Sequence, residues 1–576
     1  MRMPPIHLLF RLPAWRRPRP PIRTAAGPSP AGTPPAGPHR RTPPRSLVRS
    51  TGLLALGNAV NRAVGLVYRM VLSRFLGAEA LGLFQMAMSL YFAVLLPFIA
   101  GLPSALSRVV AGRRSEGVPA DTRRLVVQVI ALTLALLAVV LGAILTTGWS
   151  PPGAGWDLAR QLVPLPLLAP AVALAVVSAA LRGVFFGQQR VLPVVSAQVG
   201  EQMLRLLVLA ALLGWAGMGW AGVGGSGAAS AGAAGAEARL RIVMINLIIG
   251  EGVGCLLLWT AYRRLLAEPW VLRPLGAPRP AAGGEPQTLS RVVRMAVPMG
   301  LQRAAWSLER LAEATLIPAA LQRSGATLGA AVAAYGELTA MASPLIFLPN
   351  VVVHALTHTL VPGVAEVTDR PALLHHRVRR ALTLTADLGV LTTLVLAFAG
   401  GWLTAVLFGF TGDGAGYPSA GRLAERLALL AAVVYVDHVA AAVLRGLERA
   451  TEPMVVDFAT MGLRLGLLVV LGSRMGLGID AVVISLTAAA AAAALLDLAL
   501  AGYYSGLGLG ILAPVVPAWV AGAAGLAAGG AVRLALAPLA GPGTVRAAAL
   551  AAALACYAVV RLGAVVSAAG SGARRS

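Results

Sequence analysis

Apolar stretches of membrane length recur along almost the whole chain, and they restrict its fold more than any other feature. Of the 576 residues, 57% are hydrophobic and 12% are charged, and the mean hydropathy is +0.76. A water-soluble protein of this size needs more charged surface, whereas about 20 apolar residues let a helix cross a bilayer. The stretches are continuous rather than alternating, which disfavours a membrane β-barrel. We therefore predict an all-α polytopic membrane protein.

The lengths of these stretches predict about fourteen transmembrane helices. The expected spans are 51–76, 82–106, 124–148, 159–181, 193–219, 239–262, 292–318, 332–360, 381–408, 423–444, 453–473, 479–503, 511–535 and 545–567. Arginines gather in every second loop, while loops 149–158 and 409–421 contain none. Because basic loops stay in the cytoplasm, we place both termini on the cytoplasmic side of the cell membrane. The net charge of +25 is then a property of these loops and does not indicate nucleic-acid binding.

The order of segments predicts two lobes built from one repeat. The triplet Leu-Arg-Gly occurs at 181–183 and again at 444–446, six spans later, and a Pro follows each triplet at Pro193 and Pro453. We predict a disordered basic cytoplasmic arm first, since it is rich in Arg and Pro and contains no acid. The predicted boundaries are 1–48 for this arm, 49–265 for the N-lobe (six helices), 266–290 for a cytoplasmic linker, 291–505 for the C-lobe (six helices) and 506–576 for two further helices with a short tail.

The first span carries polar residues where hydrocarbon is expected. Asn58, Arg62, Gly65 and Arg69 are spaced i, i+4, i+7 and i+11, so a helix places them on one stripe. A cation inside a bilayer is costly and normally faces the interior of a bundle or a water-filled space. The stripe predicts a hydrated, positively charged path and therefore an anionic or polar cargo.

The seventh span opens the second lobe in a similar way, with Arg303 and Arg310 seven residues apart. Two arginine-bearing helices, one from each lobe, predict a polar central cavity. The predicted cavity residues are Asn58, Arg62, Arg69, Arg303, Arg310, Glu201 and Arg205. A structural alternative is that Arg310 pairs with Glu309 or Glu313 and only locks helices together.

Several acids in or near the spans are candidates for ion coupling, and we single out Glu251, Glu309 and Asp387. Structural alternatives stay open here too. Glu201 or Glu251 can partner the arginines of the first span, and Asp457 can pair with Arg464, seven residues later.

The sequence gives no reason to expect a cofactor. It contains no GxxxxGK[ST] loop, so we expect no ATP hydrolysis. His354 and His358 are spaced like metal ligands on a helix, yet no third ligand accompanies them, so we expect no metal. We expect a monomer, because packing within one chain explains the small-residue pair Gly525 and Gly529 as well as dimerisation does.

Several short motifs occur along the chain: Arg62-x-x-Gly65, Tyr68-Arg69, Arg74-Phe75-Leu76-Gly77-Ala78-Glu79-x-Leu81-Gly82, Gly101 to Ser107, Leu181-Arg182-Gly183 with Gly187-Gln188, Tyr335-Gly336 with Pro344, and Leu360-Val361-Pro362. In these motifs the chain resembles the stage V sporulation protein B branch of the multidrug/oligosaccharidyl-lipid/polysaccharide exporter superfamily. The resemblance covers nearly all of the chain after about Ser46.

This resemblance implies two six-helix lobes that rock about a pseudo-two-fold axis in alternating access. It implies a flippase that moves a lipid-linked precursor, such as lipid II or another undecaprenyl-pyrophosphate sugar, between leaflets, with a role in the spore cortex. The expected partners are this lipid-linked oligosaccharide and membrane lipids. Arginine suits a pyrophosphate, because it stays charged and offers several donors. The charge pattern of related lipid II flippases is only partly kept: Tyr68 and Arg69 stand where they carry Arg-Asp, and the second span lacks their arginines.

Two other functions remain as alternatives. A drug/cation antiporter of the same superfamily is disfavoured because the first span is cationic. A glycan-lipid polymerase or ligase is expected to carry a large external loop with catalytic residues, whereas the external loops here are short or rich in Gly and Ala. We therefore predict a transporter rather than an enzyme.

Overall fold

The computed structural model describes residues 45–111, 120–148, 151–162, 168–215, 233–267, 289–409 and 420–573. Every regular element within these ranges is a helix, and residues from Arg49 onward form one compact unit. The predicted basic arm lies outside the described residues except for its last four positions, and the predicted linker 266–290 does so except for its ends.

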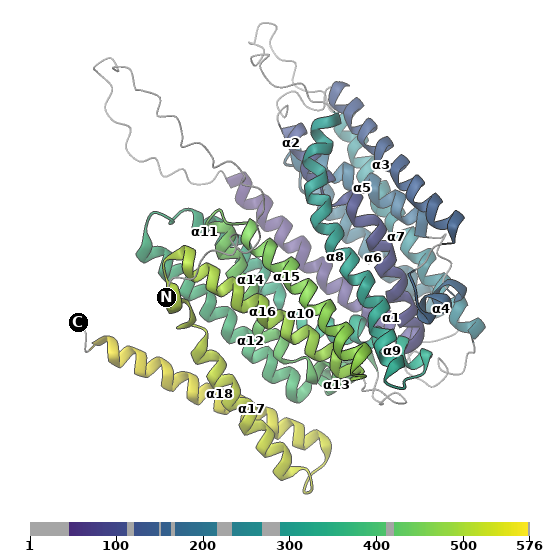
Figure 1. The fold of residues 1–576 in the computed structure, drawn as a ribbon. Coiled ribbons are helices and arrows are strands. Elements are labelled where there is room, and N and C mark those ends of the chain that lie inside the picture. Colours follow the sequence, from purple (N-terminus) through teal and green to yellow (C-terminus); the bar gives the residue numbers. More distant parts are fainter. Residues whose placement is uncertain are drawn as a thin grey trace, which may run out of the picture. The chain divides into compact units, whose positions relative to one another are not determined.

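The first half of the chain folds into seven helices within the described ranges (Figure 1). Predicted span 82–106 is divided between two of them at residues 100–101, and the described parts of predicted span 159–181 belong to two helices. They are α1 (Arg45–Ile99), α2 (Leu102–Ala111), α3 (Ala120–Thr147), α4 (Ala154–Leu162), α5 (Leu168–Gly187), α6 (Leu192–Trp215) and α7 (Ala233–Ala267). α1 contains two predicted spans, which are separated at Gly77. This glycine has φ 76° and ψ 172°, a conformation that only glycine adopts without strain.

The second half repeats this arrangement with more breaks. Its elements are α8 (Leu289–Arg323), α9 (Leu328–Glu337), the π-helical turn η6 (Leu338–Ala342), α10 (Ser343–Phe347), α11 (Asn350–Ala365), α12 (Pro371–Phe408), α13 (Ala420–Arg426), α14 (Leu429–Gly446), α15 (Thr451–Leu467), the π-helical turn η7 (Leu468–Arg474) and α16 (Ile479–Ser505). A short 3₁₀ turn, η8 (Gly508–Leu512), then leads to α17 (Val516–Leu536) and α18 (Pro542–Ala573).

Twelve helices among the described residues are long and apolar enough to cross a membrane, where the sequence predicts about fourteen. One of the twelve stretches, Gly57–Ala111, includes the first two predicted spans. α8, the predicted seventh span, is not among the twelve, because charged residues from Arg291 to Arg323 interrupt it. The predicted all-α membrane fold is confirmed.

The repeated Leu-Arg-Gly triplets occupy equivalent positions in the two halves. A Cβ on Gly183 of α5 would lie 2.9 Å from Leu106 Cβ of α2, and one on Gly446 of α14 would lie 2.7 Å from Val364 Cβ of α11. Each glycine thus lets one helix approach its neighbour closely. The sequence repeat therefore marks the same helix–helix contact in both halves.

The predicted eighth span is broken rather than straight. α10 begins at Ser343 directly after the π-helical turn η6, and Pro344 is its second residue. The Ser343 hydroxyl donates to the carbonyl of Leu338 at 2.7 Å. A proline cannot donate a backbone hydrogen bond, so the helix changes its hydrogen-bonding pattern at this point. Pro349 then separates α10 from α11, which carries Asn350 and His354.

The two halves meet where α1 passes Gly77. The indole of Trp156 on α4 donates to Thr315 Oγ1 of α8 at 3.0 Å, and Arg74 donates to the carbonyl of Val406 at 2.9 Å. On α1, most residues from Val71 to Tyr91 are buried, whereas Arg62 and Arg69 are exposed. The first and last parts of α1 therefore have different surroundings: the helix is tightly packed from Val71 onward and more exposed before it.

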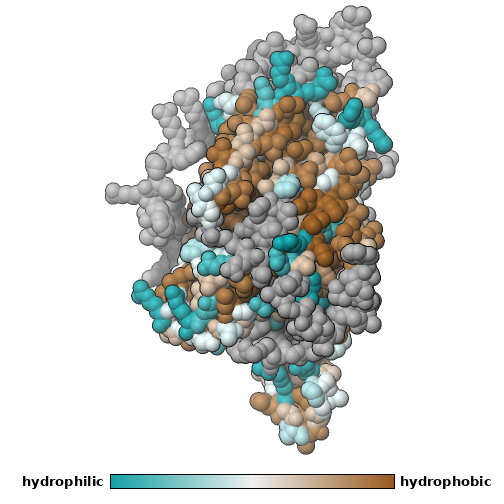
Figure 2. Space-filling view, turned by 90° about the vertical axis from the view of Figure 1, so that its right-hand side faces the viewer, coloured by the Kyte–Doolittle hydropathy of each residue, from teal (hydrophilic) through white to brown (hydrophobic). Residues whose placement is uncertain are grey.

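Hydrophobic residues make up much of the face shown in Figure 2. Large apolar side chains are exposed elsewhere on the helices too, and Val127 and Val139 of α3 are 64% and 69% exposed. Such a surface is stable in lipid but not in water. It confirms that the helices are built for a membrane.

The contact between α1 and α9 gives the first testable prediction. A Cβ on Gly82 would lie 2.0 Å from the carbonyl oxygen of Val332, whereas one on Gly462 of α15 would meet nothing within 4 Å. We expect Gly82→Ala to lower the free energy of unfolding by about 1–3 kcal/mol through overpacking. Gly462→Ala should leave it unchanged or raise it by up to about 1 kcal/mol.

Thermal unfolding of the purified protein in detergent measures both variants. Equal melting temperatures for Gly82→Ala and Gly462→Ala would contradict the close contact between α1 and α9 at Gly82.

Candidate functional site

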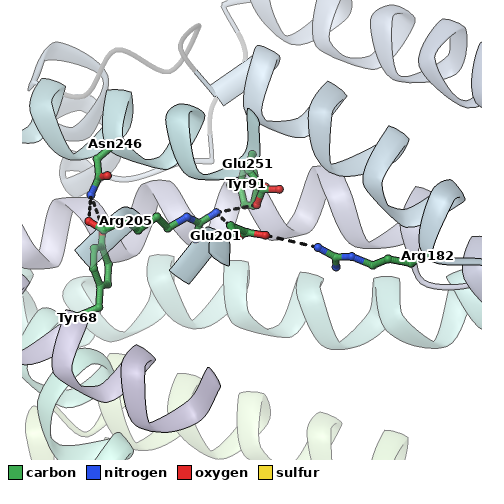
Figure 3. Close-up of polar contacts among 7 residues, drawn as sticks. All are labelled: Tyr68, Tyr91, Arg182, Glu201, Arg205, Asn246 and Glu251. Carbon is green, nitrogen blue, oxygen red and sulfur yellow. Dashed lines mark hydrogen bonds and ion pairs between the residues drawn. The ribbon is translucent and has the colours of Figure 1, made fainter. Parts of the chain in front are cut away.

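Four charged residues form a buried network in the first half (Figure 3). Arg205 and Glu201 lie one turn apart on α6, Glu251 comes from α7, and Arg182 from α5. Arg205 Nη2 is 2.8 Å from Glu201 Oε1 and 2.9 Å from Glu251 Oε1, and these three side chains are only 9–13% exposed. Arg182 Nη2 lies 3.5 Å from Glu201 Oε2. Two cations thus balance two carboxylates, as a low-dielectric environment requires.

Neutral groups complete this network. Tyr91 of α1 donates to Glu251 Oε1 at 3.4 Å, and Asn246 of α7 donates to the carbonyl of Arg205 at 3.1 Å. The Nδ2 of Asn246 is also 3.5 Å from the hydroxyl of Tyr68 on α1. The network therefore joins α1, α5, α6 and α7.

Two glycines on α7 make space for the charged side chains, and the sequence interpretation missed them. A Cβ on Gly250 would lie 2.2 Å from Arg205 Nε, and one on Gly254 would lie 2.8 Å from Glu201 Oε2. These glycines flank Glu251 at a spacing of four, so they share one face of the helix. The sequence signal that could have revealed these two glycines is their position on either side of an acid within an apolar span.

A second network in the other half also combines one arginine with two glutamates. Arg464 of α15 lies 3.3 Å from Glu309 and also pairs with Glu313, and both acids are on α8. Arg464 therefore pairs with α8 instead of Asp457. The neighbouring Arg310 of α8 interacts electrostatically with Glu313.

Asp387 of α12, one of the predicted coupling acids, faces the last helix of the chain. Its carboxylate accepts from Arg561 Nε at 2.8 Å and from the Tyr557 hydroxyl at 2.7 Å, both on α18. The other two predicted coupling acids, Glu251 and Glu309, lie in the two arginine networks. The structure thus places the three acids at three separate sites.

The predicted cavity arginines of α1 and α8 are exposed, in contrast to Arg205. Arg69 and Arg310 lie close enough to repel each other electrostatically, although they come from different halves. Arg62 is in electrostatic range of His354 on α11. Arg303 lies over the ring of Trp306, 4.9 Å from its centroid. Within the described ranges, none of these four arginines forms an ion pair with a carboxylate.

A small cluster of polar side chains, Asn350, His354 and His438, is in electrostatic range of Arg62 through His354. Asn350 is 2% exposed, and it lies 3.5 Å from His354 Nε2 and 3.2 Å from His438 Nδ1 of α14. Asn58, the first member of the predicted stripe, is exposed on α1. Among the described residues, no group of three or more His, Cys, Asp or Glu side chains is arranged to hold a metal ion.

These features define the class of protein: a helical membrane protein with a buried ion-pair network in each half and with arginines from the two halves, Arg69 and Arg310, in electrostatic range of each other. Residues 47–368 match the family described as polysaccharide biosynthesis protein, and the chain belongs to this family. The family match and the relatives described next confirm the resemblance seen in the sequence.

Named relatives agree with this assignment. The chain is 25% identical over 442 residues to stage V sporulation protein B of Bacillus subtilis (strain 168), which covers 76% of this chain and 79% of that protein. Its fold is similar to the lipid II flippase MurJ in an inward closed conformation, with TM-score 0.58, 11% identity and coverage of 88% and 97% of the two chains. It is also similar to an inward-facing multidrug resistance MATE family transporter, with TM-score 0.57, 14% identity and coverage of 77% and 95%.

The buried network of the first half gives the second prediction. Arg205→Leu removes the cation between Glu201 and Glu251, and we expect the free energy of unfolding to fall by about 3–5 kcal/mol, because buried Glu251 loses its ion-pair partner and Glu201 keeps only Arg182. Adding Glu251→Gln to Arg205→Leu should restore most of this loss, because Arg182 then balances Glu201. Thermal unfolding in detergent provides the measurement.

The matched control is Arg241→Leu on α7. Arg241 pairs with Glu237, and the two side chains are 59% and 33% exposed. Such surface pairs contribute about 0–1 kcal/mol. If the control and Arg205→Leu unfold at the same temperature, the network does not hold these helices together.

Proposed function

We propose that this protein is a flippase that moves a lipid-linked cell-wall or polysaccharide precursor, an undecaprenyl-pyrophosphate sugar of the lipid II kind, across the cytoplasmic membrane by alternating access. The observation that carries the proposal is the pair Arg69 and Arg310, two exposed arginines from different halves that repel each other. Neither has a carboxylate partner within ion-pair distance in the part of the chain that the structure describes. Two facing cations are stabilised when a polyanion lies between them.

The chemistry of a pyrophosphate fits this requirement. A guanidinium stays charged and gives several donors to phosphate oxygens, and Arg62 and Arg303 add two more exposed cations on the same two helices. Asn58 and the Asn350–His354–His438 group supply neutral donors suited to sugar hydroxyls. The polyprenyl tail needs no protein cavity, because it can remain in the surrounding lipid.

The relatives support this cargo. One solved structure with this fold is a lipid II flippase, and the curated relative that covers most of the chain is a sporulation protein. We therefore infer a role in peptidoglycan synthesis, including the spore cortex. We also infer a monomer with both termini in the cytoplasm, which agrees with the arginine-rich loops of the sequence.

The second candidate function is a multidrug/cation antiporter, because the fold is shared with a multidrug resistance transporter. Exposed, unpaired arginines repel an organic cation, so this candidate requires another binding site. The balanced network around Arg205 offers none, because its carboxylates are already neutralised.

A leaflet-accessibility assay for lipid II tests the proposal in cells whose only flippase is this protein. We expect Arg69→Gln and Arg310→Gln each to reduce outward movement by about 10- to 100-fold, since a hydrogen bond to a charged group contributes about 1.5–3 kcal/mol. Both variants should melt no lower than the wild type, because each removes one of two like charges.

Arg426→Gln is the matched control, since Arg426 lies on α13 and pairs with Asp480 at an exposed site. It should transport normally. Normal transport by both cavity variants would contradict the assignment of the cavity. If the stable wild type does not move lipid II, another lipid-linked glycan should be tested next.

A further inference from the structure

A hydrogen-bonded cluster of one asparagine and two histidines lies where the predicted eighth span is broken. Asn350 and His354 are in the first two turns of α11, directly after Pro349, and His438 is on the adjoining helix α14. The side-chain amide of Asn350 lies 3.5 Å from Nε2 of His354 and 3.2 Å from Nδ1 of His438. The centroids of the two imidazole rings are 5.1 Å apart, with 31° between the ring planes.

The amide of Asn350 cannot treat the two rings alike. Its oxygen only accepts hydrogen bonds and its nitrogen only donates them, whereas a neutral imidazole has one nitrogen of each kind. The amide nitrogen donates to His354 Nε2, so the proton of this ring is on Nδ1. The amide oxygen accepts from His438 Nδ1, which leaves Nε2 of this ring as an acceptor. If the amide were turned over, the rings would exchange roles, and one would still be a donor and the other an acceptor.

The outer nitrogens of the two rings, Nδ1 of His354 and Nε2 of His438, have no hydrogen-bond partner in the described part of the protein. Both side chains are partly exposed, and neither nitrogen is among the buried polar atoms that lack a partner there. They are therefore open to a ligand or to water. A cluster that only ties α11 to α14 gives no reason to leave a donor and an acceptor open side by side.

The cluster lies on the side of α11 that faces the other half of the chain. Arg62 of α1 is exposed and is in electrostatic range of His354. His358, one turn further along α11, is exposed as well. Helices that are interrupted within the membrane often form the substrate sites of transporters. The cluster thus adds neutral hydrogen-bonding groups next to one of the exposed arginines.

We propose that His354 and His438, which Asn350 holds in opposite tautomers, form a subsite for the hydroxyl groups of the cargo's sugar. A hydroxyl group both donates and accepts hydrogen bonds, so it matches a donor beside an acceptor. An ionised phosphate only accepts, so it matches the arginines instead. Asn350 is then a positioning residue, since it acts through the two rings. This inference rests on the proposed function for the presence of a sugar on the cargo.

The subsite gives the protein a way to distinguish a loaded carrier from an empty one. A site built to hydrogen-bond a hydroxyl group rejects an analogue that lacks it, because the polar groups of the site are then left unpaired. We therefore infer that the cluster favours a glycosylated undecaprenyl pyrophosphate over bare undecaprenyl pyrophosphate, which the arginines bind equally well.

Two substitutions remove the outer nitrogens and keep the bonds to Asn350. The amide of a glutamine reaches the position of a histidine Nε2, and the amide of an asparagine reaches that of Nδ1. His354→Gln therefore loses only Nδ1, and His438→Asn loses only Nε2. His376→Gln is the matched control, because His376 is an exposed histidine on α12 outside the cluster.

Binding of lipid II and of undecaprenyl pyrophosphate to the full-length protein in phosphatidylcholine nanodiscs tests the subsite. We expect His354→Gln and His438→Asn each to weaken the binding of lipid II by about 3- to 10-fold, the effect of one neutral hydrogen bond. Both should bind undecaprenyl pyrophosphate like the wild type. Arg69→Gln should weaken both lipids by the same factor, and His376→Gln neither. Histidine variants that affect both lipids equally, or neither, would overturn the proposal.

Nitrogen-15 NMR of the histidine-labelled protein tests the tautomers without any cargo. Protonated and unprotonated ring nitrogens differ in chemical shift, and the two histidine variants assign the signals. We expect His354 and His438 to be in opposite tautomers, and Asn350→Leu to abolish this difference and to weaken the binding of lipid II. Two rings in the same tautomer in the wild type would contradict the positioning role of Asn350 and the subsite with it.

The outcomes separate this inference from the proposed function. If lipid II binds and crosses the membrane, but both histidine variants bind it like the wild type, the subsite alone is refuted. If lipid II binds with the expected dependence on both histidines but does not cross, the flippase is refuted and the subsite is supported. If the wild type binds neither lipid, both proposals are wrong.

Discussion

A charge that lies within a membrane-spanning bundle must be compensated, and the rest of this structure depends on how each charge meets that demand. The charges of Arg205 and Arg464 are compensated inside the protein, where each arginine lies between two glutamates. Such pairs hold helices together, because removing one partner leaves a buried charge uncompensated and strongly destabilises the protein. Arg69 and Arg310 are exposed and have no such partner among the residues that the structure describes. The division between satisfied and unsatisfied charges separates the scaffold from the part that can accept a cargo.

The two halves solve the same packing problem with different polar chemistry. Gly183 and Gly446 permit equivalent helix contacts, and Arg205 and Arg464 occupy corresponding helices, α6 and α15. In the first half the glutamates come from α6 and α7, so this network connects helices of the first half with one another. In the second half they come from α8, the helix that also carries Arg303 and Arg310. Only the second half therefore connects its buried network directly to the exposed arginines.

Much of the fold was predictable from the sequence, because the membrane imposes simple rules on length and polarity. The helices α3, α6, α7, α12 and α16 lie close to their predicted spans. The repeat was visible in the Leu-Arg-Gly triplets, and the polar stripe of α1 in the spacing of Arg62 and Arg69. The break of the eighth span at Pro344 and Pro349 was less visible, because a proline shows where a helix is weak but not how it bends.

The partners of each charge were not predictable. The sequence alone determined the class of fold, the helices that carry arginine and the absence of acids in the first span. Only the tertiary structure decided that Glu201 and Glu251 neutralise Arg205 rather than Arg62, and that Arg464 pairs with α8 rather than Asp457. The physical reason is that an ion pair depends on distances of a few ångströms between helices far apart in the chain, whereas the length and polarity of a span are properties of contiguous residues.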